Sequence, residues 1–264
     1  MQIKLWENEI PYFDAGADTP NFMETYFIET SRGNPLPCIV VLPGGGYGGR
    51  ARHEAGPIAE FFNKRGMHAV VCEYRVSPNR YPAPLADAQR AIKILRANAK
   101  EWKIDPNRIV TLGFSAGGHL SAACATLPDV TRDRIGADAV DKENHKPNGT
   151  VLCYAAVSFD KEYGNYRCGD NFLGEEVNAR ESEYFSLEKR VADDTPPAFV
   201  WHTSDDNVVN VTVSLRYGEA LRAHNIPFEM HVFPKGPHGL GLATGKKDVE
   251  QWAGMCADWI IRNV

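Results

Sequence analysis

The pentapeptide Gly113-Phe-Ser-Ala-Gly117 places a serine where an apolar stretch, residues 108–114, meets a helix-like stretch, residues 116–125. A serine held on a sharp strand-to-helix turn presents its hydroxyl at the head of the helix. The two glycines remove the Cβ atoms that would clash in so tight a bend. Ser115 is therefore the first candidate for a nucleophile.

A serine hydroxyl is a poor nucleophile unless a base takes its proton and a third group orients that base. His238 is the candidate base, because it stands between Pro237 and Gly239 on a sharp loop after the last expected strand. Where a serine sits on this type of turn, the chain order is serine, acid and histidine, and each residue follows its own strand.

The acid is expected in the polar turn 203–209, which lies between the serine and the histidine in the chain. Asp205 and Asp206 both qualify by position. We favour Asp206, because His202 stands four residues before it as in the motif H-G-x-x-D-x-x-V, with Thr203 at the glycine position. Asp205 is then expected to be a solvated turn residue, and His202 to brace the turn.

A glycine-rich loop, Pro43-Gly-Gly-Gly-Tyr-Gly-Gly49, follows the first expected buried strand. Glycines let a backbone approach a ligand and aim its N–H groups inward. The oxyanion formed during acyl transfer needs such donors. In the G-x-S-x-G architecture this loop complements the N–H of the residue after the serine. The expected donors are Gly45 or Gly46, together with Ala116.

The same loop also spells G-x-G-x-x-G over residues 44–49, which is a dinucleotide-binding fingerprint when it lies between a strand and a helix. Glu73, near the end of the next expected strand, would then accept a hydrogen bond from the ribose. This alternative leaves the serine pentapeptide, the acid turn and the histidine loop unexplained, whereas a hydrolase uses all four elements.

Apolar runs of strand length alternate with helical patterns from residue 37 onward. Runs that are apolar on both faces indicate a parallel sheet with helices on both sides, and thus an α/β fold. We expect strands at 37–42, 68–74, 109–114, 150–157, 198–202 and 228–233, with edge strands at 3–7 and 23–29. We expect helices from about 54 to 64, at 85–100, after Ser115, at 211–224 and at 249–262.

Residues 159–196 interrupt this alternation with a polar, aromatic-rich stretch. A structureless loop of this length is uncommon, so we expect short helices. An insertion between two strands at the carboxyl edge of the sheet would overhang a site there. We therefore expect a single domain over residues 1–264 with a small cap-like insertion at 159–196.

The 264-residue chain carries a formal net charge of −5 and has no basic run, so neither nucleic acid nor an anionic membrane surface is an expected partner. The first residues lack the apolar stretch of a signal peptide, and no segment approaches the ~18 apolar residues of a membrane span. We therefore expect a cytoplasmic protein. Its six cysteines are expected to be free thiols, with Cys168 in a loop, since none has zinc-site spacing.

These elements, in this order, resemble the α/β-hydrolase superfamily. More narrowly, they resemble the small carbohydrate esterases related to acetyl xylan esterases, a group similar to hormone-sensitive-lipase-type enzymes. The resemblance covers about residues 25–264 and is carried by residues 43–47, 74–75, 81–84, 87, 113–120, 201–206 and 234–242. The chain departs from the lipase-like relatives at Pro43, where they have histidine. Tyr74, Arg75 and Asp87 are expected to have structural roles.

The resemblance implies a serine esterase that deacetylates sugars or xylo-oligosaccharides through an acyl-enzyme, with Ser115, His238 and Asp206 as its triad. No metal or organic cofactor is required, and the partner would be a small acylated carbohydrate or another small ester. A feruloyl esterase or an arylformamidase-like hydrolase would use the same triad with a different pocket. A non-enzymatic binding module of this fold often lacks a triad member, and none is missing here. The sequence leaves the oligomeric state open, a homo-oligomer included.

Overall fold

A computed structural model describes residues 1–17, 19–29, 33–134 and 136–264 of the chain. Its centre is one eight-stranded sheet in the order β1-β2-β4-β3-β5-β6-β7-β8. β2 pairs antiparallel with β1 and with β4, and all pairs from β4 onward in this order are parallel. The mostly parallel sheet that the sequence predicts is therefore confirmed. The strands are β1 (Gln2–Lys4), β2 (Phe22–Tyr26), β3 (Leu36–Leu42), β4 (His68–Cys72), β5 (Ile104–Phe114), β6 (Gly149–Cys153), β7 (Ala198–Thr203) and β8 (Phe228–Phe233).

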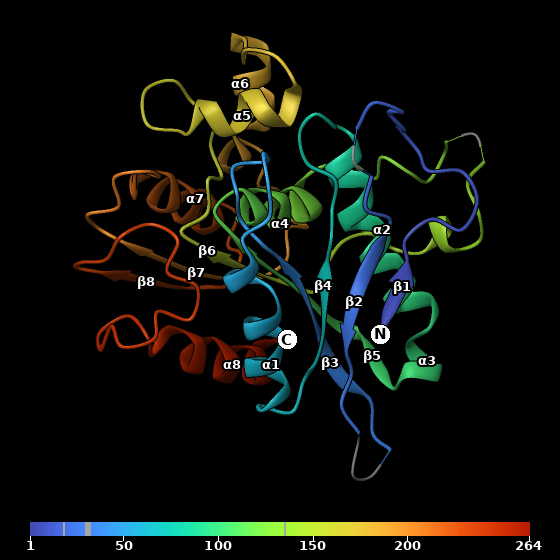
Figure 1. The fold of residues 1–264 in the computed structure, drawn as a ribbon. Helices are drawn as coiled ribbons and strands as arrows, with labels where there is room; N and C mark the ends of the chain where they lie inside the picture. Colours follow the sequence, from blue (N-terminus) through green and yellow to red (C-terminus); the bar gives the residue numbers. More distant parts are fainter. Residues whose placement is uncertain (18, 30–32, 135) are drawn as a thin grey trace.

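Helices cover both faces of this sheet (Figure 1). One face carries α1 and α8, and the other carries α2, α4 and α7. The remaining helices are α3, α5 and α6, together with three 3₁₀ turns, η1 to η3. Their bounds are η1 (Arg52–Glu54), α1 (Gly56–Asn63), α2 (Ala83–Ala97), α3 (Ala99–Trp102), α4 (Ala116–Thr126), η2 (Val140–Lys142), α5 (Tyr166–Leu173), α6 (Ala179–Phe185), η3 (Leu187–Lys189), α7 (Thr212–Ala223) and α8 (Trp252–Asn263).

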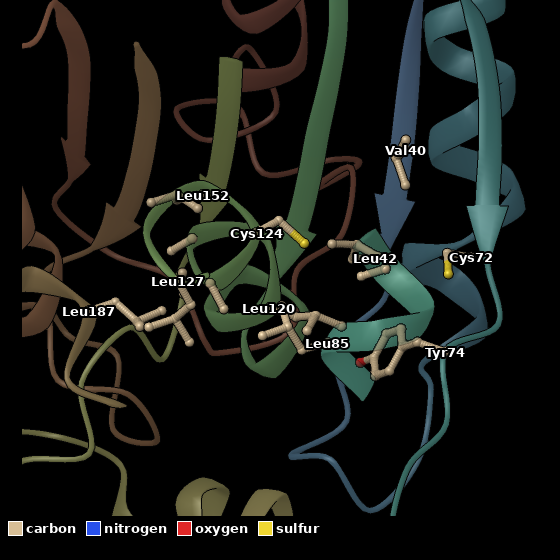
Figure 2. Packing of buried hydrophobic residues seen from close by; sticks show 14 of the residues in the cluster. Val40, Leu42, Cys72, Tyr74, Leu85, Leu120, Cys124, Leu127, Leu152 and Leu187 are labelled. Carbon is tan, nitrogen blue, oxygen red and sulfur yellow. The ribbon is translucent and has the colours of Figure 1, made fainter. Parts of the chain in front are cut away.

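Successive residues of β3 point to opposite faces, as the two-residue period of a strand requires. Val40 and Leu42 join the cluster under α2 and α4, whereas Ile39 and Val41 join the cluster under α1 and α8. Figure 2 shows part of the first cluster, in which Leu120 of α4 lies among these buried side chains. Burial on both faces explains why the inner strands β3, β4, β6 and β7 read as largely apolar runs.

The expected elements differ from the observed ones mainly at their ends. β6 ends at Cys153 rather than at 157, because Tyr154 has a φ of +37° and leaves the extended conformation. The helix expected at 85–100 is divided at Asn98 into α2 and α3. Cys168, which we expected in a loop, lies in α5, and all six cysteines are buried free thiols.

The insertion at 159–196 contains short helices, as predicted, and they lie beyond the helix layer that includes α4 (Figure 1). Two of its aromatic side chains, Phe159 and Phe172, pack against the ring of His119 in α4. The aromatic residues of the insertion thus anchor it to the domain. Among the helices that the structure describes, none combines the length and the apolar character needed to cross a membrane.

Candidate active site

Ser115 forms the turn between β5 and α4, with a φ of +52° and a ψ of −116°. Such a backbone is strained for a residue with a side chain and persists only where its surroundings hold it. The Ser115 carbonyl accepts hydrogen bonds from the N–H groups of His119 (3.1 Å) and Ala156 (3.0 Å). A Cβ on Gly117 would collide with the Leu42 carbonyl oxygen, so this turn requires glycine there.

The structure brings the three expected triad side chains together from the loops that follow β5, β7 and β8. The His238 Nε2 atom lies 2.8 Å from the Ser115 Oγ atom, and the His238 Nδ1 atom lies 2.7 Å from the Asp206 Oδ2 atom. Because Nδ1 faces a carboxylate, it carries the ring proton. Nε2 is then free to accept the serine proton.

Asp206 is buried, and four donors surround its carboxylate. Besides His238, the N–H groups of Val208 (2.9 Å) and Val209 (3.0 Å) donate to Oδ1, and the His202 Nε2 atom lies 3.2 Å from Oδ2. Burial by itself raises the pKa of Asp206, but the hydrogen bonds from His202, His238 and the two valines outweigh it and hold that pKa well below its usual value. Asp206 is therefore an anion over the working range of a histidine base.

The residues beside the acid have distinct positions. His202 braces the turn as predicted, since its Nε2 atom also lies 3.0 Å from the Val209 carbonyl and its Nδ1 atom lies 2.8 Å from the Ser214 hydroxyl. Asp205 is exposed, but it is more than the solvated residue we expected. Its Oδ1 atom accepts a 2.8 Å hydrogen bond from the Gly236 N–H and thus steadies the loop that leads to His238.

The glycine-rich loop has positive φ values, which favour glycine, of +137° at Gly45 and +61° at Gly46. The Gly44 carbonyl accepts from the Ala51 N–H (2.8 Å), and the Gly45 carbonyl accepts from the Gly48 N–H (3.0 Å). In a trans peptide the N–H points opposite to the C=O. The N–H groups of Gly45 and Gly46 therefore point away from these bonds.

Those two N–H groups have no hydrogen-bond partner within the described part of the chain, and neither has the Ala116 N–H at the start of α4. Gly45 and Gly46 also line the same cavity as Ser115. All three expected oxyanion donors are thus unoccupied beside the serine.

The dinucleotide alternative required Glu73 to be free for a ribose. Instead, its carboxylate is buried and pairs with Arg50 (2.7 Å) and Arg52 (2.6 Å). The first glycine of the fingerprint, Gly44, donates its N–H to the Glu54 carboxylate (2.8 Å). The geometry therefore does not support a dinucleotide site at this loop.

Structural roles are confirmed for the polar residues beneath the site. The Tyr74 hydroxyl donates to the Pro43 carbonyl at 2.5 Å, where the glycine-rich loop begins. Arg75 and Asp87 form a fully buried ion pair at 2.8 Å. The described residues that line the cavity at Ser115 include none of these three, Tyr74, Arg75 and Asp87.

The cavity at Ser115 has a volume of about 380 Å³. The insertion contributes Asn165, Arg167 and Asn171 to its wall, and the Asn171 Nδ2 atom donates to the Gly46 carbonyl at 2.8 Å. Among the described residues that line it, none is Phe, Tyr or Trp. The lining residues are Gly45, Gly46, Ala51, His53, Glu54, Ser115, Asn165, Arg167, Cys168, Asn171, Val208, His238 and Gly239.

Sequence reasoning missed several of these positions. It assigned no role to His53, which lines the cavity. The His53 Nε2 atom lies 2.9 Å from the Gly239 carbonyl oxygen. It also missed Arg167 and Asn171, because their insertion has no motif that fixes how it folds over the site. The polar character of the insertion was the only sequence signal for them.

A family model described as BD-FAE matches residues 23–221. The chain belongs to the BD-FAE family. This BD-FAE chain is 36% identical over 248 residues to "Endo-1,4-beta-xylanase B" of Butyrivibrio fibrisolvens, with 91% of the chain and 38% of that protein covered. It is 30% identical over 228 residues to "Acetylxylan esterase" of Xylanibacter ruminicola, with 84% of the chain and 45% of that protein covered.

The BD-FAE chain therefore spans less than half the length of these two curated relatives. Among solved structures, it is similar to an acetyl ester-xyloside bifunctional hydrolase from Caldicellulosiruptor lactoaceticus, with 42% identity and a TM-score of 0.93. That match covers 99% of this chain and 96% of the other. The α/β-hydrolase fold and the esterase relationship implied by the sequence are confirmed.

Proposed function

We propose that this chain is a serine carboxylic ester hydrolase that removes acetyl groups from sugars or xylo-oligosaccharides. The observation that carries the proposal is the unbroken hydrogen-bonded series from Ser115 through His238 to the buried Asp206 carboxylate. Unoccupied backbone N–H groups stand beside the serine, as acyl transfer requires.

In the first half of the reaction, the Ser115 Oγ atom bonds to the ester carbonyl carbon while the His238 Nε2 atom takes the serine proton. The N–H groups of Gly45 or Gly46 and of Ala116 hold the oxyanion. When the tetrahedral intermediate collapses, His238 delivers the proton to the leaving alcohol, and an acyl-enzyme remains. Asp206 orients the imidazole and stabilises its charged form.

In the second half, a water molecule bonds to the acyl carbon while His238 takes one of its protons. Collapse of the second tetrahedral intermediate breaks the bond to Ser115, and the proton returns to the serine oxygen. The carboxylic acid leaves. Every proton is thus carried by one residue, His238.

An acetylated sugar is favoured by two observations. The names of two relatives include acetylxylan esterase and acetyl ester-xyloside hydrolase. The cavity wall offers polar groups from the insertion, at Asn165, Arg167 and Asn171, and no aromatic slot for a feruloyl ring among its described residues. Amide and guanidinium groups suit sugar hydroxyls as hydrogen-bond donors.

A panel of p-nitrophenyl esters and one natural substrate class tests the proposal. We expect kcat/KM to be at least about tenfold higher for acetyl than for butyryl and feruloyl esters, since each methylene that an acyl site does not accommodate can cost about 1–3 kcal/mol. Acetate should also be released from acetylated xylo-oligosaccharides, although a sugar alkoxide is a poorer leaving group than p-nitrophenolate. A preference for feruloyl esters would contradict the acyl assignment, and no turnover of any ester would contradict the proposed function.

A further inference from the structure

Glu54 is a buried carboxylate beside the triad that the proposed reaction does not use. It ends the η1 turn, and only 2% of the residue is exposed. Its Oε2 atom accepts the Gly44 N–H at 2.8 Å, and its Oε1 atom accepts the Tyr154 hydroxyl at 2.5 Å. Burial of a carboxyl group costs much free energy unless its oxygens accept hydrogen bonds, and both oxygens of Glu54 accept one.

Tyr154 continues this chain of contacts to the other side of the site. Its hydroxyl accepts the Gly241 N–H at 2.9 Å, three residues after His238. Its ring meets the His238 ring edge-on, with centroids 4.9 Å apart. Burial, and then the charge of Glu54, raise the pKa of Tyr154, so the phenol keeps the proton that it donates.

The loop that offers oxyanion donors and the loop that carries the base are therefore joined through two buried side chains. Gly44 directly precedes Gly45, so the bond from its N–H to Glu54 helps to fix the backbone from which the oxyanion donors project. The bond from the Gly241 N–H to the Tyr154 hydroxyl holds the segment that follows His238 in place. Tyr154 itself directly follows β6 with a φ of +37°, a strained backbone typical of a residue held in place by its partners.

We propose that Glu54 and Tyr154 are a positioning pair that holds the oxyanion donors and His238 at the mutual distance that the transition state needs. The proposal rests on the proposed ester hydrolysis. Neither residue reacts with substrate. Their contribution is to kcat, since a shift of about 1 Å in a catalytic group can cost about 100-fold in rate.

Tyr154→Phe removes one hydroxyl and keeps the ring against His238. We expect kcat for p-nitrophenyl acetate to fall about 10- to 100-fold while KM changes less than about threefold. The reason is that the relative position of the oxyanion donors and His238 affects the transition state more than it affects substrate binding. The Ki of a trifluoromethyl ketone, which forms a tetrahedral adduct with a serine nucleophile, should rise by a similar factor. A role in stability alone would leave this Ki unchanged in the folded variant.

Tyr163→Phe is the matched control. The Tyr163 hydroxyl donates to Glu188 at 2.9 Å, so the same atom is removed from the same kind of pair, at a position that does not line the cavity. We expect its kcat to stay within about twofold of the parent. Glu54→Gln, which keeps one acceptor oxygen, should lose less rate than Glu54→Ala.

The outcomes separate the two proposals. The pair is refuted if Tyr154→Phe keeps the parent kcat, if Tyr163→Phe loses as much, or if the loss lies in KM alone. Denaturant unfolding of each variant confirms that folded protein is assayed. If the parent protein hydrolyses no ester, the proposed function fails, and the ketone also fails to inhibit.

Discussion

Replacing Ser115 with alanine is expected to lower kcat for p-nitrophenyl acetate by about 10⁵- to 10⁶-fold, because no acyl-enzyme can then form. The hydroxyl is 2.8 Å from the His238 Nε2 atom, and it makes no other hydrogen bond to the residues that the structure describes. The measurement is initial-rate kinetics on purified protein at saturating ester.

The fold should survive this change. Ser115 has a strained backbone, and its hydroxyl contributes nothing to the hydrogen bonds that hold the turn, which are made by main-chain atoms. The denaturant midpoint of Ser115→Ala should therefore stay close to that of the parent. Retained turnover in a folded Ser115→Ala protein would show that another group is the nucleophile.

The second large effect is expected at the acid. Asp206→Asn should lower kcat about 10⁴-fold, because an amide in place of the carboxylate favours the wrong tautomer of His238 and no longer stabilises its charged form. The Asp206 carboxylate accepts two hydrogen bonds from backbone N–H groups, at Val208 and Val209. The amide oxygen of asparagine can still accept both.

Asp205→Asn is the matched control, since it makes the same change one residue away. Asp205 is exposed, and an asparagine oxygen can still accept the Gly236 N–H, so we expect kcat within about threefold of the parent. A larger loss at position 205 than at 206 would overturn the assignment of the acid. Equal losses of kcat in the two variants would indicate that activity depends on the shape of the turn and not on one carboxylate.

The sequence predicted those parts of the site that depend on chain order and local geometry. Ser115, Asp206 and His238 follow the strands β5, β7 and β8, and the carboxyl ends of neighbouring parallel strands meet at one edge of the sheet. Three positions far apart in the chain therefore had to converge. The glycine-rich loop was recognisable because positive φ values favour glycine, and at Gly45 a Cβ would also collide with the Gly49 carbonyl.

What the sequence did not reveal depends on tertiary contacts without a local signal. The buried carboxylate of Glu54 reads as an ordinary helix-start acid, and its partner Tyr154 reads as the interior of a strand. That strand ends early only because Tyr154 leaves the extended conformation where the chain turns toward the insertion. The cavity wall at Arg167 and Asn171 depends on how the insertion packs, which aromatic contacts with His119 determine.

Ser115 is expected to form a covalent bond with a serine-directed reagent while His238 takes its proton. The most direct measurement is peptide mapping by mass spectrometry after treatment with a serine-directed organophosphate. We predict one phosphoryl adduct per chain, on the peptide that contains Ser115, with parallel loss of esterase activity. An adduct on another serine, or full inactivation without modification of Ser115, would show that Ser115 is not the nucleophile.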